Sequence, residues 1–79
     1  MNSREKKEET AMTFGQKIEL LRTQRNMTLR KLAEKSGISY SLIQSIIQDD
    51  RVPAKEAIPS LARALFYEDV EELLKLAGY

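Results

Sequence analysis

One glycine interrupts two runs of helix-type apolar spacing in the middle of this chain. The stretch KLAEKSGISYSLIQSII, residues 31–47, has apolar residues at helical intervals on both sides of Ser36-Gly37. Glycine is the residue best able to adopt a positive φ after a helix, and Ser39 is a favoured N-cap for the next one. The sequence therefore predicts two short helices, 29–36 with Thr28 as its N-cap and 40–48, joined by a tight turn.

Two helices joined by such a turn cross at a steep angle, and the second can project from the body of the domain. The apolar residues expected to hold the crossing are Leu32, Ala33, Ile38, Ile43 and Ile46. The remaining face of 40–48 carries Tyr40, Ser41, Gln44, Ser45 and Gln48, none of which is charged. The DNA major groove displays hydrogen-bond donors, acceptors and thymine methyl groups, so a face of this kind suits it.

The rest of the chain also reads as helical. Apolar spacing predicts a helix over 14–25, with Thr13 as its N-cap and Asn26 as a left-handed stop after it. It predicts another helix over 58–66 with a proline in its first turn, and a last one starting at 67 or 68 and stopped by Gly78. No segment has the alternation of a strand. We therefore expect an all-α domain of five short helices over 13–79, preceded by a flexible charged tail, 1–12.

Composition excludes several functions. The 79 residues include no Cys and no His, which removes thiolate and imidazole metal ligands and the usual general base. We therefore expect no enzyme activity, metal or cofactor. No apolar run approaches the ~18 residues of a membrane span, and the first residues are charged, unlike a secretory signal. Since the lack of Cys also suits a reducing compartment, we expect a cytoplasmic protein.

Charge is unevenly distributed along the chain. Residues 13–63 carry nine basic and five acidic side chains, a net charge of +4, whereas 64–79 carry a net charge of −3. An anionic partner is therefore expected to meet the middle of the chain, although an ordinary solvated surface is the alternative.

The stretch from Phe14 to Pro53, followed by SLARAL and EELLKLAGY, resembles the Cro/repressor-type (XRE-like) helix-turn-helix family. The most specific pieces are LAEKSGIS, the LLR near the end of the first helix, the proline after the third, and LARAL. The resemblance covers about 13–79 and implies a lambda-repressor-like domain whose second and third helices form the helix-turn-helix. It also implies a bacterial, phage or mobile-element DNA-binding regulator, most often a repressor that binds a palindromic operator as a homodimer.

The resemblance implies roles for individual residues. Its base-reading positions are Tyr40, Ser41, Gln44 and Ser45, and its phosphate-contacting positions are Thr28, Arg30, Ser39, Arg51 and Lys55. Gln44 is the first choice for a specific contact, because a carboxamide can bind the major-groove edge of adenine with two hydrogen bonds. For Arg30 the role of an ordinary exposed charge remains open. The dimer surface is expected at Leu74, Leu76 and Tyr79.

Three positions depart from the family pattern. Leu29 replaces a glutamine, which loses one positioning contact worth ~1 kcal/mol. Ile47 replaces a glutamate that usually pairs with the arginine at position 22, so we expect Arg22 to find another acceptor: Glu34, Asp49 or a C-terminal carbonyl of 40–48. Leaving a half-buried guanidinium without a partner would be costly.

The third departure is Asp49, which replaces a glycine. Aspartate in left-handed geometry costs roughly 1 kcal/mol more than glycine. Together with Asp50 it also places two negative charges beside the DNA-facing helix, where phosphate would repel them. An alternative function therefore stays open: a protein-binding module that keeps the fold, exposes Ile47, and acts on another regulator without binding an operator.

Overall fold

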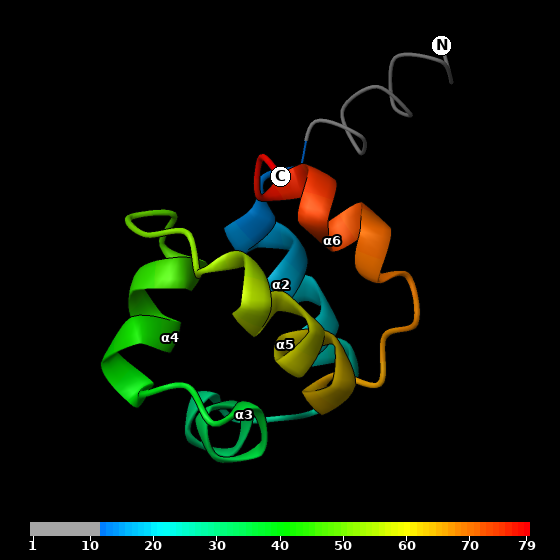
Figure 1. The fold of residues 1–79 in the computed structure, drawn as a ribbon. Coiled ribbons are helices and arrows are strands. Elements are labelled where there is room, and N and C mark those ends of the chain that lie inside the picture. The colour runs from blue at the N-terminus through cyan, green and yellow to red at the C-terminus, as the bar shows by residue number, and fades with distance from the viewer. Residues whose placement is uncertain (1–11) are drawn as a thin grey trace, which may run out of the picture.

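The protein is all-α, as predicted (Figure 1). The structure is a computed structural model that describes residues 12–79, so the expected tail lies outside the described residues except for Met12. The elements are α2 (Phe14–Gln24), α3 (Leu29–Ser36), α4 (Tyr40–Ile47), the short 3-10 helix η1 (Lys55–Ala57), α5 (Ile58–Ala64) and α6 (Val70–Leu76). Within this range there is no strand. The five predicted α-helices are confirmed, whereas η1 was not predicted.

The first three helices begin at the predicted N-caps. Thr13, Thr28 and Ser39 all have extended backbone, and each side-chain oxygen accepts the N–H of the residue three positions on. Thr13 also forms a capping box, because the Gln16 side chain accepts the Thr13 N–H in return at 3.0 Å. Asn26 (φ 53°) ends the first helix in the left-handed geometry that the sequence predicted.

The predicted start of the fourth helix at 58 is confirmed, but its predicted end and the predicted start of the last helix are wrong. Phe66 adopts a left-handed φ of 55°, which stops α5 at Ala64 instead of 66. Asp69 then acts as the N-cap of α6 and accepts the N–H of Glu72 at 3.2 Å. As a result α6 begins at Val70 and not at 67 or 68, because a capping carboxylate competes with helical continuation at its own position.

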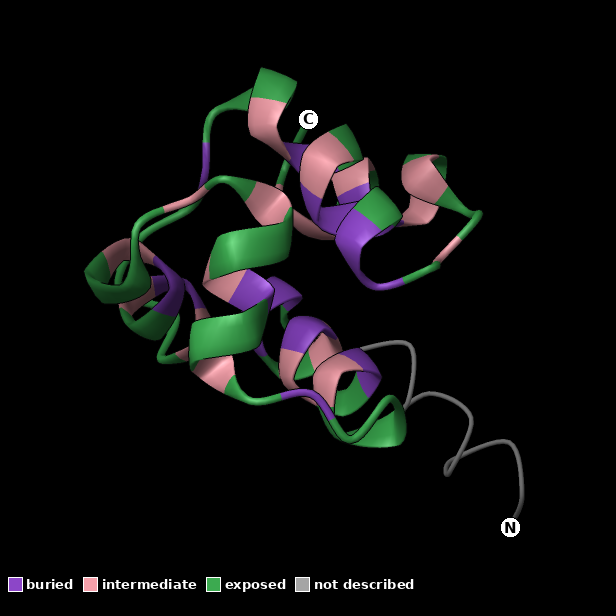
Figure 2. Ribbon diagram, turned by 90° about the horizontal axis from the view of Figure 1, so that it is seen from below, coloured by how far each residue is buried: buried purple, intermediate pink, exposed green. Residues whose placement is uncertain are grey.

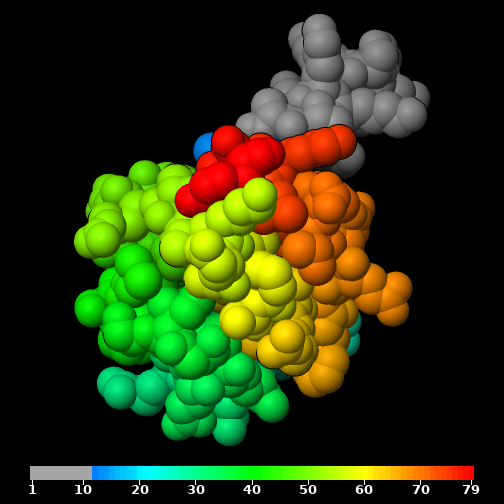
Figure 3. Space-filling view, in the orientation of Figure 1, coloured from blue at the N-terminus to red at the C-terminus, as the bar shows by residue number. Residues whose placement is uncertain are grey.

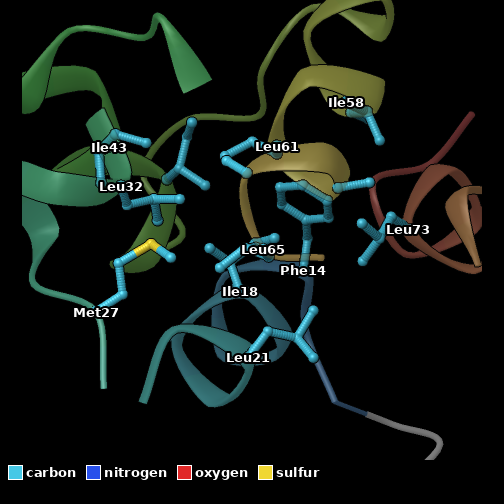
Figure 4. Close-up of a cluster of buried hydrophobic side chains, with 13 residues drawn as sticks. Phe14, Ile18, Leu21, Met27, Leu32, Ile43, Ile58, Leu61, Leu65 and Leu73 are labelled. Carbon is cyan, nitrogen blue, oxygen red and sulfur yellow. The ribbon is translucent and has the colours of Figure 1, made fainter. Parts of the chain in front are cut away.

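Every α-helix contributes to one hydrophobic core (Figure 4). The core consists of Phe14, Ile18, Leu21, Met27, Leu32, Ile43, Ile46, Ile58, Leu61, Ala62, Ala64, Leu65 and Leu73. In the view of Figure 4, Phe14 and Ile18 of α2 lie between Leu32 on one side and Leu73 on the other. Along the helices, buried residues recur every three or four positions with exposed residues between them, as one buried face of a helix requires (Figure 2).

The α4 helix lies on one side of the molecule and α6 on the other (Figure 1). α4 packs against α2 and α3, whereas α6 packs against α5. The chain end is held to the loop after α4, since the Tyr79 hydroxyl donates to the Pro53 carbonyl at 2.8 Å. Figure 3 shows the C-terminal residues against this segment.

Candidate nucleic-acid interface

The turn between α3 and α4 is built by Ser36, Gly37 and Ser39. Gly37 has a φ of 76°, and its N–H donates to the Ala33 carbonyl at 2.9 Å, which closes the last turn of α3. The Ser36 hydroxyl accepts the next N–H, that of Ile38, at 3.3 Å. Ser39 caps α4 immediately afterwards. The turn thus ends one helix and starts the next within three residues.

Buried apolar side chains fix how α4 leaves this turn. Ile43 and Ile46 of α4 and Leu32 of α3 are all 0% exposed. Ala33 and Ile38 are partly buried and pack against this core. The predicted packing cluster is therefore confirmed, with Ala33 and Ile38 at its edge. Because both inward positions of α4 are completely covered, its opposite face points outward.

The outward face of α4 is polar and uncharged. Tyr40, Ser41 and Gln44 are exposed, and Ser45 is half-buried. Tyr40 and Gln44 lie one helical turn apart, and the Gln44 Nε2 donates a long hydrogen bond of 3.4 Å to the Tyr40 hydroxyl oxygen. Side chains of this kind can donate to and accept from base edges, and the tyrosine ring can contact a thymine methyl group.

Arg30 joins the starts of α3 and α4. Its guanidinium lies over the Tyr40 ring, with Cζ 4.8 Å from the ring centroid. A cation held over an aromatic face loses part of its conformational freedom before it meets a ligand.

Thr28, at the start of α3, keeps a free hydrogen-bond donor. Its side-chain oxygen accepts the Lys31 N–H at 3.0 Å, so the hydroxyl proton of Thr28 remains available to a phosphate.

Four of the predicted site residues surround one shallow hollow. Ser39, Ser41, Ser45 and Arg51 line it together with Leu42. The loop after α4 turns back to form it, because the N–H groups of both Asp50 and Arg51 donate to the Ser45 carbonyl, at 2.9 Å and 3.3 Å. Lys55 is exposed in η1 and does not line this hollow. Of the five predicted phosphate contacts, only Ser39 and Arg51 line this hollow, whereas Thr28, Arg30 and Lys55 lie outside it.

Arg22 has acceptors, as predicted, but the predicted identities are wrong. Its Nε and Nη2 donate to the two carboxylate oxygens of Glu19 at 3.0 Å and 2.5 Å, and Nη1 donates to the Met27 carbonyl at 2.6 Å. Glu19 lies one turn back on the same helix, so the pair forms without any contribution from α4. The two-oxygen geometry also lowers the pKa of Glu19 below its ordinary value.

The two aspartates after α4 differ in their surroundings. Both are exposed. Asp49 has the predicted left-handed φ, 63°, and its carboxylate accepts hydrogen bonds from the start of α2, which the carboxylate of Asp50 does not. Ile47, expected to be exposed in the alternative function, is half-buried and packs against the core. The predicted apolar surface for a protein partner is therefore smaller than the sequence suggested.

Gly15 is the residue whose importance was missed. A Cβ at this position would lie 2.5 Å from the Ile46 carbonyl oxygen and 2.7 Å from that of Ile47. The signal was present, because a glycine inside a helical pattern often marks a close approach of backbone. Gly15 allows the C-terminal end of α4 to sit directly on the first turn of α2.

Comparison with known families agrees with this geometry. Residues 18–73 match a helix-turn-helix family model, a range that includes α3, the turn and α4. The chain belongs to this family of XRE-type helix-turn-helix proteins, which are DNA-binding regulators and generally not enzymes. No curated protein and no solved structure matches the chain significantly. Over residues 12–79, no helix is both long and apolar enough to cross a bilayer.

Proposed function

We propose that this protein is a sequence-specific transcriptional regulator that binds double-stranded DNA by placing α4 in the major groove. The observation that carries the proposal is the exposed, uncharged face of Tyr40, Ser41 and Gln44 on a helix whose inward side is completely buried. A rigid helix with such a face can read base edges without paying to desolvate a charge. Ser45, at the edge of the same face, is the fourth proposed base-reading residue.

Contacts to phosphate would orient the helix in the groove. We assign them to Thr28, Arg30, Ser39, Arg51 and Lys55. Thr28 and Ser39 stand at helix N-termini, where backbone N–H groups and the helix dipole favour an anion. Arg30 and Arg51 flank this region and supply positive charge. Phosphate contacts carry no sequence information, so changing them is expected to weaken binding to all DNA alike.

The finer parts of the proposal follow from the family. We infer a repressor of bacterial, phage or mobile-element origin that acts in the cytoplasm at the nucleoid. A homodimer would place its two α4 helices about 34 Å apart, one DNA turn, on a palindromic operator. Leu74, Leu76 and Tyr79 are the proposed dimer contacts; the two leucines are half-buried and Tyr79 is 51% exposed.

Salt-titrated binding tests the proposal. A protein that makes about five phosphate contacts per subunit gives a slope of about −4.5 for each bound subunit, or about −9 for the proposed homodimer, in a plot of log K against log salt concentration. We expect this slope together with a preference for particular duplexes from the host genome over random duplex. Binding with neither a preference nor a salt dependence of this kind would contradict the proposal.

The second candidate is a protein-binding module that has lost operator binding. The observation that favours it is the absence of Lys or Arg from α4 itself, together with the exposed Asp50 in the following loop. The same titration separates the two functions, because the module would not distinguish any duplex from random DNA even at low salt. Its partner would then be sought among other regulators.

A further inference from the structure

The loop after α4 begins with an aspartate in a conformation that normally favours glycine. Asp49 has a φ of 63°, and the following N–H, that of Asp50, donates to the Ser45 carbonyl at 2.9 Å. This is the hydrogen bond of a Schellman motif, in which glycine is the preferred residue at the left-handed position. A side chain that is strained at such a position calls for a compensating contact.

The contact is made with the first turn of α2. One carboxylate oxygen of Asp49 accepts the Gly15 N–H at 2.9 Å, and the other accepts the Thr13 hydroxyl at 2.7 Å. The first N–H groups of a helix have no partner within the helix, and the helix dipole favours negative charge there. Hydrogen bonds to an ionised group are also stronger than neutral ones. The carboxylate thus joins the end of α4 to the start of α2.

No other polar side-chain contact makes this connection. Within the described part of the chain, the two bonds of Asp49 are the only side-chain hydrogen bonds or ion pairs between α2 with its N-cap and residues 40–51. Ile47 of α4 has no polar side-chain group, and Arg22 of α2 pairs with Glu19 of its own helix, so these two residues form no ion pair between α2 and α4. The absence of a Cβ on Gly15 allows the close approach, because Asp49 Oδ1 lies 2.7 Å from where that atom would be.

We propose that Asp49 is a positioning residue for DNA recognition, a clamp that fixes the direction of α4 and thereby the orientation of its base-reading face. The inference rests on the proposed function. Asp49 acts through α4 and does not itself touch a base. A carboxylate that only repelled DNA would weaken all binding equally, whereas a clamp that aims α4 affects the preference for one sequence over another.

The test measures sequence preference, the ratio of the dissociation constants for random duplex and for a duplex selected by the wild-type protein. Asp49→Gly relieves the left-handed strain and removes both hydrogen bonds. We expect its preference to fall about fivefold to tenfold, the change that the net loss of one ordinary hydrogen bond predicts. Asp49→Asn keeps an acceptor for the Gly15 N–H and tolerates the left-handed conformation, so it should restore part of the preference.

Asp50→Asn is the matched control, since it removes the same charge from the next residue, which is exposed and makes no side-chain hydrogen bond in the described range. It should keep the wild-type preference. The Gly15 amide resonance in a proton–nitrogen correlation spectrum should move in Asp49→Gly and stay in place in Asp50→Asn. Urea unfolding of each variant shows that the assays are made on folded protein.

The outcomes separate the clamp from the proposed function. If all three variants keep the wild-type preference, the clamp is wrong while DNA recognition stands. If Asp49→Gly does not fold, the comparison of Asp49→Asn with Asp50→Asn decides, because only the former loses the bond from Thr13. If the wild-type protein itself has no preference, the proposed function fails, and an unmoved Gly15 resonance in Asp49→Gly would overturn the clamp independently.

Discussion

The carbonyl oxygen of Ile46 occupies the space that a side chain on Gly15 would need, 2.5 Å from the position of its Cβ. Real Cβ atoms do not approach other atoms so closely. The obstacle is backbone, so no change of rotamer relieves it. This contact between the last turn of α4 and the first turn of α2 therefore sets how closely the two helices approach.

Gly15→Ala is expected to destabilise the protein by about 1–3 kcal/mol, the usual cost of forcing extra atoms into a packed site. The sign is the informative part, because an alanine in an unobstructed helix would instead add about 1 kcal/mol of stability. Urea unfolding of the two proteins measures the difference. An increase in stability would show that α4 does not pack against Gly15.

Arg30→Ala is expected to weaken binding to every duplex and to reduce the magnitude of the salt slope by about 0.9 for each bound subunit, the contribution of one phosphate contact. The reason is that Arg30, placed over the Tyr40 ring, flanks the base-reading face without belonging to it. Arg63→Ala, which removes an exposed arginine of α5, is the control and should leave the slope unchanged. A loss confined to one base pair would make Arg30 a base-reading residue instead.

The pair of Glu19 and Arg22 predicts a dependence of stability on pH. Hydrogen bonds from Arg22 lower the pKa of Glu19 below its ordinary 4.5. A carboxyl group with a lower pKa in the folded state adds stability above its unfolded pKa, and this contribution is lost as the pH falls through the folded pKa. The Glu19 side chain is 40% exposed, so the contribution is expected to stay below about 1 kcal/mol.

Urea midpoints of the wild-type protein and of Glu19→Gln measure this effect. The wild-type protein should be more stable at neutral pH, and the difference should shrink as the pH falls below the ordinary Glu value of 4.5. A difference that stays constant, or that grows in acid, would show that Glu19 gains nothing from its charge.

Sequence reasoning predicted the helix-turn-helix because its signals are local. N-cap residues, the glycine between the two helices and apolar spacing act over three or four positions, and a single chain reveals them directly. Thr28, Gly37 and Ser39 behave as predicted for this reason. The late start of α6 was missed because the capping role of Asp69 was not recognised from the sequence.

The surroundings of the candidate interface were less accessible to sequence reasoning. The contact between Asp49 and Gly15 joins residues 34 positions apart, and nothing local indicates that they meet. The family resemblance predicted an acceptor for Arg22 on Glu34 or at the end of α4, whereas the acceptor in the structure, Glu19, lies one turn away on the same helix. Long-range polar contacts depend on the packing of the helices, which apolar periodicity predicts only in outline.

Selection of bound duplexes from a random library, repeated with Gln44→Ala, tests the central claim most directly. The wild-type protein is expected to select one sequence family, and Gln44→Ala should relax the preference at one base pair by about 1–3 kcal/mol while leaving the other positions unchanged. Gln24→Ala, a change of an exposed glutamine at the end of α2, is the control and should select the wild-type sequences. Uniform weakening by Gln44→Ala, or no selected sequence for the wild-type protein, would contradict the assignment of α4 as the recognition helix.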